Sequence, residues 1–168
     1  MVRENAWTGC DKKKINKVME FCEGYRQFIS SCKTERECAA RSIELAKEHG
    51  YKDLNEIIKK GGTLKAGDKV YACNMGKALV LFNVGREPLE NGMKILGAHI
   101  DSPRLDVKQN PLYQDEDFAL LDTHYYGGIK KYQWVTIPLA IHGTIAKKDG
   151  TVQDIIICLL STSDAADE

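Results

Sequence analysis

Residues 94–105, Lys-Ile-Leu-Gly-Ala-His-Ile-Asp-Ser-Pro-Arg-Leu, decide how this chain is interpreted. The apolar residues before the histidine predict a strand, and the Ser-Pro pair predicts the turn that ends it. Because side chains alternate along a strand, His99 and Asp101 are expected on the same side, at its carboxyl end. Open α/β sheets bind ligands at that edge. A carboxylate beside an imidazole orients a metal-binding histidine, so the segment predicts half of a metal site.

The His-x-Asp pair also has a purely structural interpretation, in which the histidine simply hydrogen-bonds a neighbouring carboxylate. Two features favour a site. The small residues Gly97 and Ala98 leave room around His99, and the Ser-Pro turn places the pair at an edge. The remaining ligands of a metal site would have to come from elsewhere.

Composition excludes several classes of function. The 24 Lys and Arg residues balance the 24 Asp and Glu residues, so no excess positive charge exists to bind nucleic acid. No apolar run is long enough to span a bilayer, and the N-terminus lacks the apolar segment of a signal peptide. None of the six cysteines form a C-x-x-C pair, which indicates reduced, apolar thiols. We therefore expect a cytoplasmic protein with no nucleic-acid or membrane partner.

The first part of the chain shows helical periodicity. Apolar residues spaced by three and four predict helices over residues 11–31, 34–50 and 54–60. Asp11 is the expected N-cap of the first helix. The second opens with the capping box Thr34-Glu35-Arg36-Glu37 and ends at a glycine.

From residue 69 onward the period changes to that of strands. Two strands around an Asn-Met-Gly turn predict a hairpin, and further strand-like stretches follow, at 69–74, 77–83, 94–100, 104–109, 132–145 and 151–158. The expected fold class is α/β, with N-terminal helices on the first strands of a mixed sheet.

Three segments together resemble a known family. They are Gly-Ala-His-Ile-Asp-Ser-Pro-Arg-Leu at 97–105, Tyr-Gly-Gly-Ile at 126–129 and Tyr-Gln-Trp-Val-Thr-Ile-Pro-Leu at 132–139. This combination resembles the aspartyl-aminopeptidase family of zinc aminopeptidases, in particular its bacterial branch, over roughly residues 10–158. The resemblance implies that residues 1–107 begin the α/β/α catalytic domain. Residues 108–160 would then begin the β-rich oligomerisation domain that the family inserts.

The resemblance also implies an activity and roles for two residues. His99 would be a zinc ligand, and Asp101 would accept a hydrogen bond from its other ring nitrogen. The family uses two zinc ions and a metal-activated water to remove N-terminal amino acids from peptides. We therefore expect zinc as cofactor, a peptide as substrate and a homo-oligomer in the intact protein.

The other ligands of the family's site have no counterpart here. They are a bridging Asp, a general-base Glu beside a ligand Glu, a further carboxylate and a final His, and this chain has no Glu-Glu pair. The resemblance gives neither His124 nor His142 a metal role. Residues 161–168 are acidic and patternless, and are expected to be a non-native tail. The chain is thus expected to be an inactive N-terminal fragment.

Two alternatives remain open from the sequence. One is a non-catalytic regulatory or oligomerisation module that keeps the His-x-Asp pair for structural reasons. The other is a related co-catalytic zinc deacylase, because that wider group shares the His-x-Asp pair. The segments at 126–128 and 132–139 favour the aminopeptidase.

Overall fold

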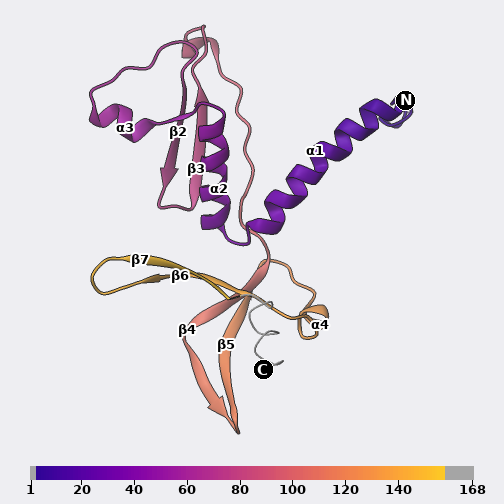
Figure 1. The fold of residues 1–168 in the computed structure, drawn as a ribbon, viewed down its shortest axis with the longest axis vertical. Helices are drawn as coiled ribbons and strands as arrows, with labels where there is room; N and C mark the ends of the chain where they lie inside the picture. The colour runs from indigo at the N-terminus through magenta and orange to yellow at the C-terminus, as the bar shows by residue number, and fades with distance from the viewer. Residues whose placement is uncertain (1–2, 158–168) are drawn as a thin grey trace. The chain divides into compact units, whose positions relative to one another are not determined.

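A computed structural model describes residues 3–157 of the chain, helices first and strand pairs afterwards (Figure 1). The chain divides into two compact units between Leu96 and Gly97. The first unit holds helices and a mixed sheet, which confirms the predicted α/β class. The expected tail at 161–168 lies outside the described residues, and the expected domain boundary near residue 108 stays a prediction.

The first helix begins where the sequence predicts. Helix α1 spans Lys12–Ser31, and the Asp11 side chain accepts a hydrogen bond from the Lys14 backbone N–H at 2.7 Å. That bond satisfies one of the free N–H groups at the helix start. None of the residues of α1 is buried, and Phe21 is 79% exposed. The apolar face expected of this helix therefore exists in sequence but is not covered by the described residues.

Helices α2, at Glu35–Glu48, and α3, at Leu54–Lys59, also match their predictions. The capping box is complete: Thr34 accepts from the Glu37 N–H, and the Glu37 carboxylate accepts from the Thr34 N–H. Gly50 follows the helix with φ of 84°, a left-handed conformation suited to glycine.

A three-stranded mixed sheet covers one face of α2. Strand β1 (Lys52–Asp53) runs parallel to β2 (Lys69–Asn74), and β2 pairs antiparallel with β3 (Ala78–Asn83). Helix α2 lies beside β2 and β3 (Figure 1). The buried residues come from this layer and the loop before it: Cys32, Cys38, Ala39, Ala46, Val70 and Tyr71.

The turn of the β2–β3 hairpin forms as its sequence predicts. Met75 and Gly76 both have positive φ, at 54° and 68°, as a tight hairpin turn requires. The Arg36 Nη1 group of α2 donates to the Met75 carbonyl at 3.1 Å, which ties the helix to the turn. A 3-10 turn at Leu89–Asn91 follows the hairpin.

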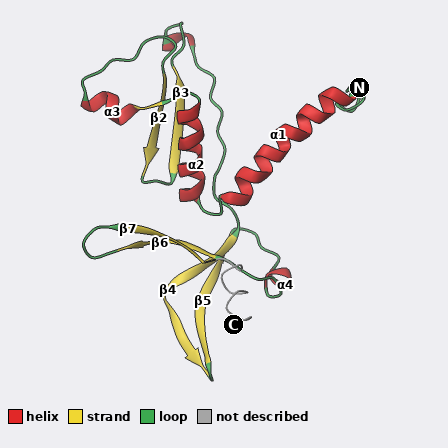
Figure 2. Cartoon of the chain, in the orientation of Figure 1, coloured by secondary structure: helices red, strands yellow, loops and turns green. Residues whose placement is uncertain are grey.

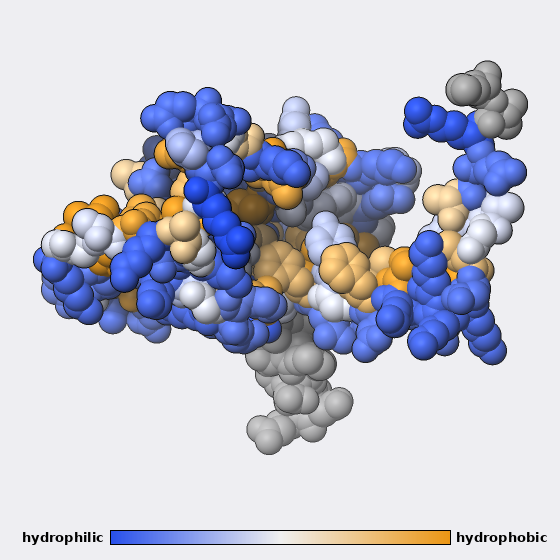
Figure 3. All heavy atoms as spheres, turned by 90° about the horizontal axis from the view of Figure 1, so that it is seen from above, coloured by the Kyte–Doolittle hydropathy of each residue, from blue (hydrophilic) through white to orange (hydrophobic). Residues whose placement is uncertain are grey.

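The second unit consists of two antiparallel strand pairs and a short helix (Figure 2). Strand β4 (Arg104–Asp115) pairs with β5 (Phe118–Tyr126), and β6 (Ile141–Ala146) pairs with β7 (Val152–Ile157). Helix α4 spans Lys131–Trp134. None of the residues described between 97 and 157 is buried. Many apolar side chains are exposed at the surface, shown in orange in Figure 3.

The strand expected at residues 94–100 is not present. This segment has no regular secondary structure, and Ile95 and Leu96 are 79% and 99% exposed. A strand is held by hydrogen bonds to a neighbouring strand, and no strand within residues 3–157 pairs with this segment. Its apolar sequence suits a buried strand, but the described residues supply no sheet for it to join.

The strand predicted within residues 132–145 is also shorter than expected. Its first residues belong to α4, and the strand begins only at Ile141. Pro138 lies between the two elements and has no N–H to donate to a strand ladder. No helix among the described residues is long and apolar enough to cross a membrane.

Candidate metal-binding site

The structure brings His99 and Asp101 together, although in a loop and not at a strand end. The His99 Nδ1 atom lies 3.0 Å from the Asp101 carboxylate Oδ1 and 3.0 Å from the Asp101 backbone oxygen. Both oxygens are acceptors, so Nδ1 carries a proton and donates it. A neutral imidazole protonated at Nδ1 presents its lone pair at Nε2.

The pair is accessible from solvent. The side chain of His99 is 84% exposed and that of Asp101 is 37% exposed. The Nε2 atom of His99 has no hydrogen-bond partner among residues 3–157. The exposed nitrogen can therefore donate its lone pair to an electrophile such as a metal ion.

The described residues supply only one clear ligand position. Within residues 3–157, no three His, Cys, Asp or Glu side chains come close enough to hold a metal ion together. A catalytic zinc normally has three protein ligands. The pair is thus part of a site and not a complete one.

Tyr126, the last residue of β5, completes the arrangement around Asp101. Its hydroxyl donates to the Asp101 Oδ2 atom at 2.8 Å, so both carboxylate oxygens accept hydrogen bonds. The Tyr126 hydrogen bond is the largest cause that lowers the pKa of Asp101, and the neighbouring His99 lowers it further. Asp101 is therefore ionised at neutral pH, as an acceptor for the imidazole N–H must be.

Arg104 supports Tyr126 from the neighbouring strand. The two residues are directly opposite in the β4–β5 register, and the Arg104 guanidinium lies 4.1 Å from the centre of the Tyr126 ring. The Arg104 Nε group donates to Asp106 Oδ1 at 2.7 Å, and Nη1 donates to the Ser102 carbonyl at 3.3 Å. The hydrogen bond to Ser102 joins the loop of the His-Asp pair to the hairpin, and the cation–π contact and the bond to Asp106 hold the Arg104 side chain within the hairpin.

The glycine after Tyr126 brings the chain close to the Ser-Pro turn. Gly127 has φ of 71°, and a Cβ at this position would lie 3.4 Å from the Pro103 Cα atom. The segment Tyr126-Gly127-Gly128 contributes to the family resemblance, but the sequence indicates no role for it. No spacing rule links residues 25 positions apart, so only the fold shows that Tyr126 contacts Asp101.

His49 and His124 contact backbone oxygens close to them in the sequence. His49 Nδ1 lies 2.8 Å from the Leu45 carbonyl at the end of α2, as its place in the last helical turn suggests. His124 Nδ1 lies 3.1 Å from the Tyr125 carbonyl, and His142 lies in β6.

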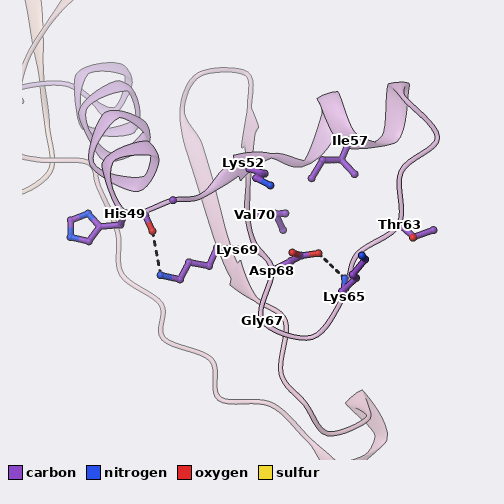
Figure 4. Close-up of a pocket in the computed structure, with 10 residues that line it drawn as sticks. His49, Lys52, Ile57, Thr63, Lys65, Gly67, Asp68, Lys69 and Val70 are labelled. Carbon is purple, nitrogen blue, oxygen red and sulfur yellow. Dashed lines mark hydrogen bonds between the residues drawn. The ribbon is translucent and has the colours of Figure 1, made fainter.

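A surface pocket in the first unit, of about 540 Å³, does not include the His-Asp pair (Figure 4). It lies where α2 ends and β2 begins, and its polar groups bond one another. Lys69 Nζ donates to the His49 carbonyl at 3.2 Å, and Asp68 Oδ2 accepts from the Lys65 N–H at 2.7 Å. The first bond closes the end of α2, and the second closes the turn before β2.

Residues 28–164 match the sequence model of a family described as Aminopeptidase I zinc metalloprotease (M18). The chain belongs to this family. The zinc aminopeptidase resemblance inferred from the segments around His99 and Tyr126 is thereby confirmed, and M18 members are zinc metallohydrolases.

M18 relatives cover nearly the whole of this chain. It is 59% identical over 154 residues to the "Probable M18 family aminopeptidase 1" of Clostridium acetobutylicum, an alignment that covers 92% of this chain and 33% of that protein. The crystal structure of aminopeptidase I from Borrelia burgdorferi B31 matches with a TM-score of 0.83 and 38% identity, over 91% of this chain and 37% of that one. The M18 aminopeptidase structure from Thermotoga maritima matches with a TM-score of 0.82 and 43% identity, over 94% and 33%. The chain therefore spans about a third of the length of these relatives.

The observed pair fits the zinc that the family description implies. A zinc-bound histidine is neutral and donates its second ring N–H to a carboxylate, which fixes its tautomer. His99 shows this arrangement, with Nδ1 against Asp101 and Nε2 exposed. The described residues thus fit one ligand and its orienting carboxylate.

Proposed function

We propose that this chain is part of a zinc aminopeptidase that removes N-terminal amino acids from peptides. The observation that carries the proposal is the His99–Asp101 pair in an M18 chain, with Nδ1 fixed at 3.0 Å and Nε2 exposed. Family membership favours this activity over the zinc deacylase. A non-catalytic module is the alternative that the experiment below must exclude.

Each residue of the pair has one role in this proposal. His99 would hold zinc through Nε2, and Asp101 would keep the imidazole in the Nδ1–H tautomer and increase its basicity as a ligand. Two bound zinc ions would polarise the scissile carbonyl and supply an activated water. The other ligands and the general base would come from the part of M18 proteins that this chain does not cover.

Further properties of the intact protein belong to the same proposal. We expect a cytoplasmic homo-oligomer whose catalytic domain begins with residues 1–107 and whose inserted β-rich domain begins with residues 108–160. The 168-residue chain by itself is expected to show no turnover, because one histidine does not hold a catalytic zinc.

A chimera tests the proposal. In it, this chain replaces the matching third of the Clostridium acetobutylicum relative, to which it is 59% identical. The folded chimera should contain zinc and hydrolyse aminoacyl p-nitroanilides, and a chelator should abolish turnover until zinc is restored. Zinc content is measured by mass spectrometry and folding by circular dichroism.

Two histidine variants make the test specific. His99→Ala should reduce zinc affinity by more than about 100-fold, since losing a ligand exceeds the loss of an outer partner. His124→Ala, outside the pair, should retain zinc and activity. A folded chimera in which His99→Ala keeps full zinc content and turnover would contradict the proposal and support a structural role for the pair.

A further inference from the structure

We propose that Tyr126 is a positioning residue: its hydroxyl fixes the Asp101 carboxylate so that Asp101 holds His99 in the Nδ1–H tautomer. The inference rests on the proposed role of His99 as a zinc ligand. It adds a third member to the pair, drawn from a different element of the fold. Tyr126 ends strand β5, whereas the pair lies in the loop before β4.

Each carboxylate oxygen of Asp101 accepts a hydrogen bond from a different side chain. Oδ2 accepts from the Tyr126 hydroxyl at 2.8 Å, and Oδ1 accepts from His99 Nδ1 at 3.0 Å. A carboxylate on an irregular loop can rotate about both of its side-chain torsions. The Tyr126 hydrogen bond selects one orientation, and that orientation presents Oδ1 to the imidazole.

Tyr126 is suited to this role because the hairpin holds it in place. It is paired with Arg104 in the β4–β5 ladder, and the Arg104 guanidinium lies 4.1 Å from its ring centre. Arg104 also donates to Asp106 in β4 and to the carbonyl of Ser102, the residue after Asp101. The loop is therefore connected to the hairpin at two adjacent residues, through the side chain of Asp101 and through the backbone carbonyl of Ser102.

The neighbouring tyrosine provides a matched control. Tyr125 precedes Tyr126 in β5, so its side chain points to the opposite face of the strand. Its ring lies 4.3 Å from the Lys131 ammonium group. Removing the Tyr125 hydroxyl therefore makes the same chemical change on the same strand, away from Asp101.

The test measures the tautomer of His99 by histidine ¹⁵N NMR in the 168-residue chain at pH 8. In the wild-type chain, His99 should show a protonated Nδ1 and an unprotonated Nε2. Tyr126→Phe keeps the ring and its contact with Arg104 but removes the hydroxyl. It should shift the His99 resonances toward those of an unconstrained imidazole, and Tyr125→Phe should leave them unchanged.

Several results would overturn the inference. A wild-type His99 protonated at Nε2 would refute it without any variant. A second such result is a pair of spectra in which Asp101→Asn changes the His99 resonances and Tyr126→Phe does not. It would show that Asp101 fixes the His99 tautomer without the Tyr126 hydroxyl. A change of equal size in both tyrosine variants would indicate a general effect on the hairpin.

Zinc affinity in the chimera separates this inference from the proposed function. Tyr126→Phe should lower zinc affinity about tenfold, the smaller effect expected of an outer partner, while Tyr125→Phe should not. If His99→Ala keeps its zinc but Tyr126→Phe still shifts the His99 tautomer, the proposed function fails and the positioning role stands. If His99→Ala loses zinc and Tyr126→Phe shifts neither tautomer nor affinity, only the positioning role fails.

Discussion

At the scale of single residues, hydrogen bonds define the candidate site and burial does not. His99 is 84% exposed, yet its Nδ1 has two acceptors within 3.0 Å, both on Asp101. The His-x-Asp spacing made this contact predictable, because two side chains only two residues apart can reach one another even in an irregular loop. The hydroxyl of Tyr126 was not predictable, since it reaches Asp101 from 25 residues away.

Gly127 allows a direct prediction at this scale. Gly127→Ala should destabilise the end of β5, because an alanine at φ of 71° is strained. A left-handed conformation costs an ordinary residue about 1–2 kcal/mol. Amide hydrogen exchange in β5 should therefore accelerate roughly 5- to 30-fold.

Gly128→Ala is the control for this substitution. No atom outside its chain neighbours lies within 4 Å of a Cβ at position 128. Its exchange rates should stay near those of the wild type. Equal acceleration in the two variants would show that the left-handed turn at Gly127 is not what constrains this corner.

At the scale of elements, the predicted helix starts and hairpin were correct where residues of the element itself supply the capping or turn hydrogen bonds. Asp11 and the Thr34–Glu37 box satisfy N–H groups of their own helices, so the helix starts were predicted correctly. The Asn-Met-Gly turn likewise predicted the β2–β3 hairpin. The segment at 94–100 has the sequence of a strand, but a strand forms only by hydrogen bonding to a second strand. The prediction of a strand at 94–100 was therefore wrong.

The β2–β3 pair offers two valines for an element-scale prediction. Val70 in β2 is 2% exposed, whereas Val80 in β3 is 63% exposed. Val70→Ala should lower the free energy of unfolding by about 2 kcal/mol, through lost burial and the cavity left behind. Val80→Ala should change it by less than about 0.5 kcal/mol.

Urea unfolding followed by circular dichroism measures the difference between the two valine variants. The midpoint for Val70→Ala should fall while the slope stays constant, as expected of a change in stability alone. Similar losses in both variants would mean that the burial of Val70 is not what stabilises this unit.

At the scale of the whole molecule, apolar surface is the dominant feature. None of the residues described between 97 and 157 is buried, although this unit contains Ile137, Leu139, Ile141, Ile145 and Ile156, all exposed by more than a third. Exposed apolar residues and open strand edges are surfaces through which proteins associate. The chain spans about a third of the length of its M18 relatives.

The isolated 168-residue chain should therefore self-associate. We expect sedimentation that depends on concentration, and binding of the dye ANS, which reports exposed apolar surface. The chimera should bind less ANS per mole, because the rest of the M18 sequence would cover the same residues. A chain that stays monomeric and binds no ANS at high concentration would show that these faces cover one another.

The sequence by itself determined the family, the helix starts, the β2–β3 hairpin and the proximity of His99 to Asp101. These features depend on residues close together in the chain, where capping, turn geometry and short-range hydrogen bonds act directly. Only the tertiary structure decided that residues 94–100 form no strand and that Tyr126 holds Asp101. Both depend on which distant residues come together, because a strand needs a neighbour and a hydrogen bond across 25 residues needs the β4–β5 register to place its donor.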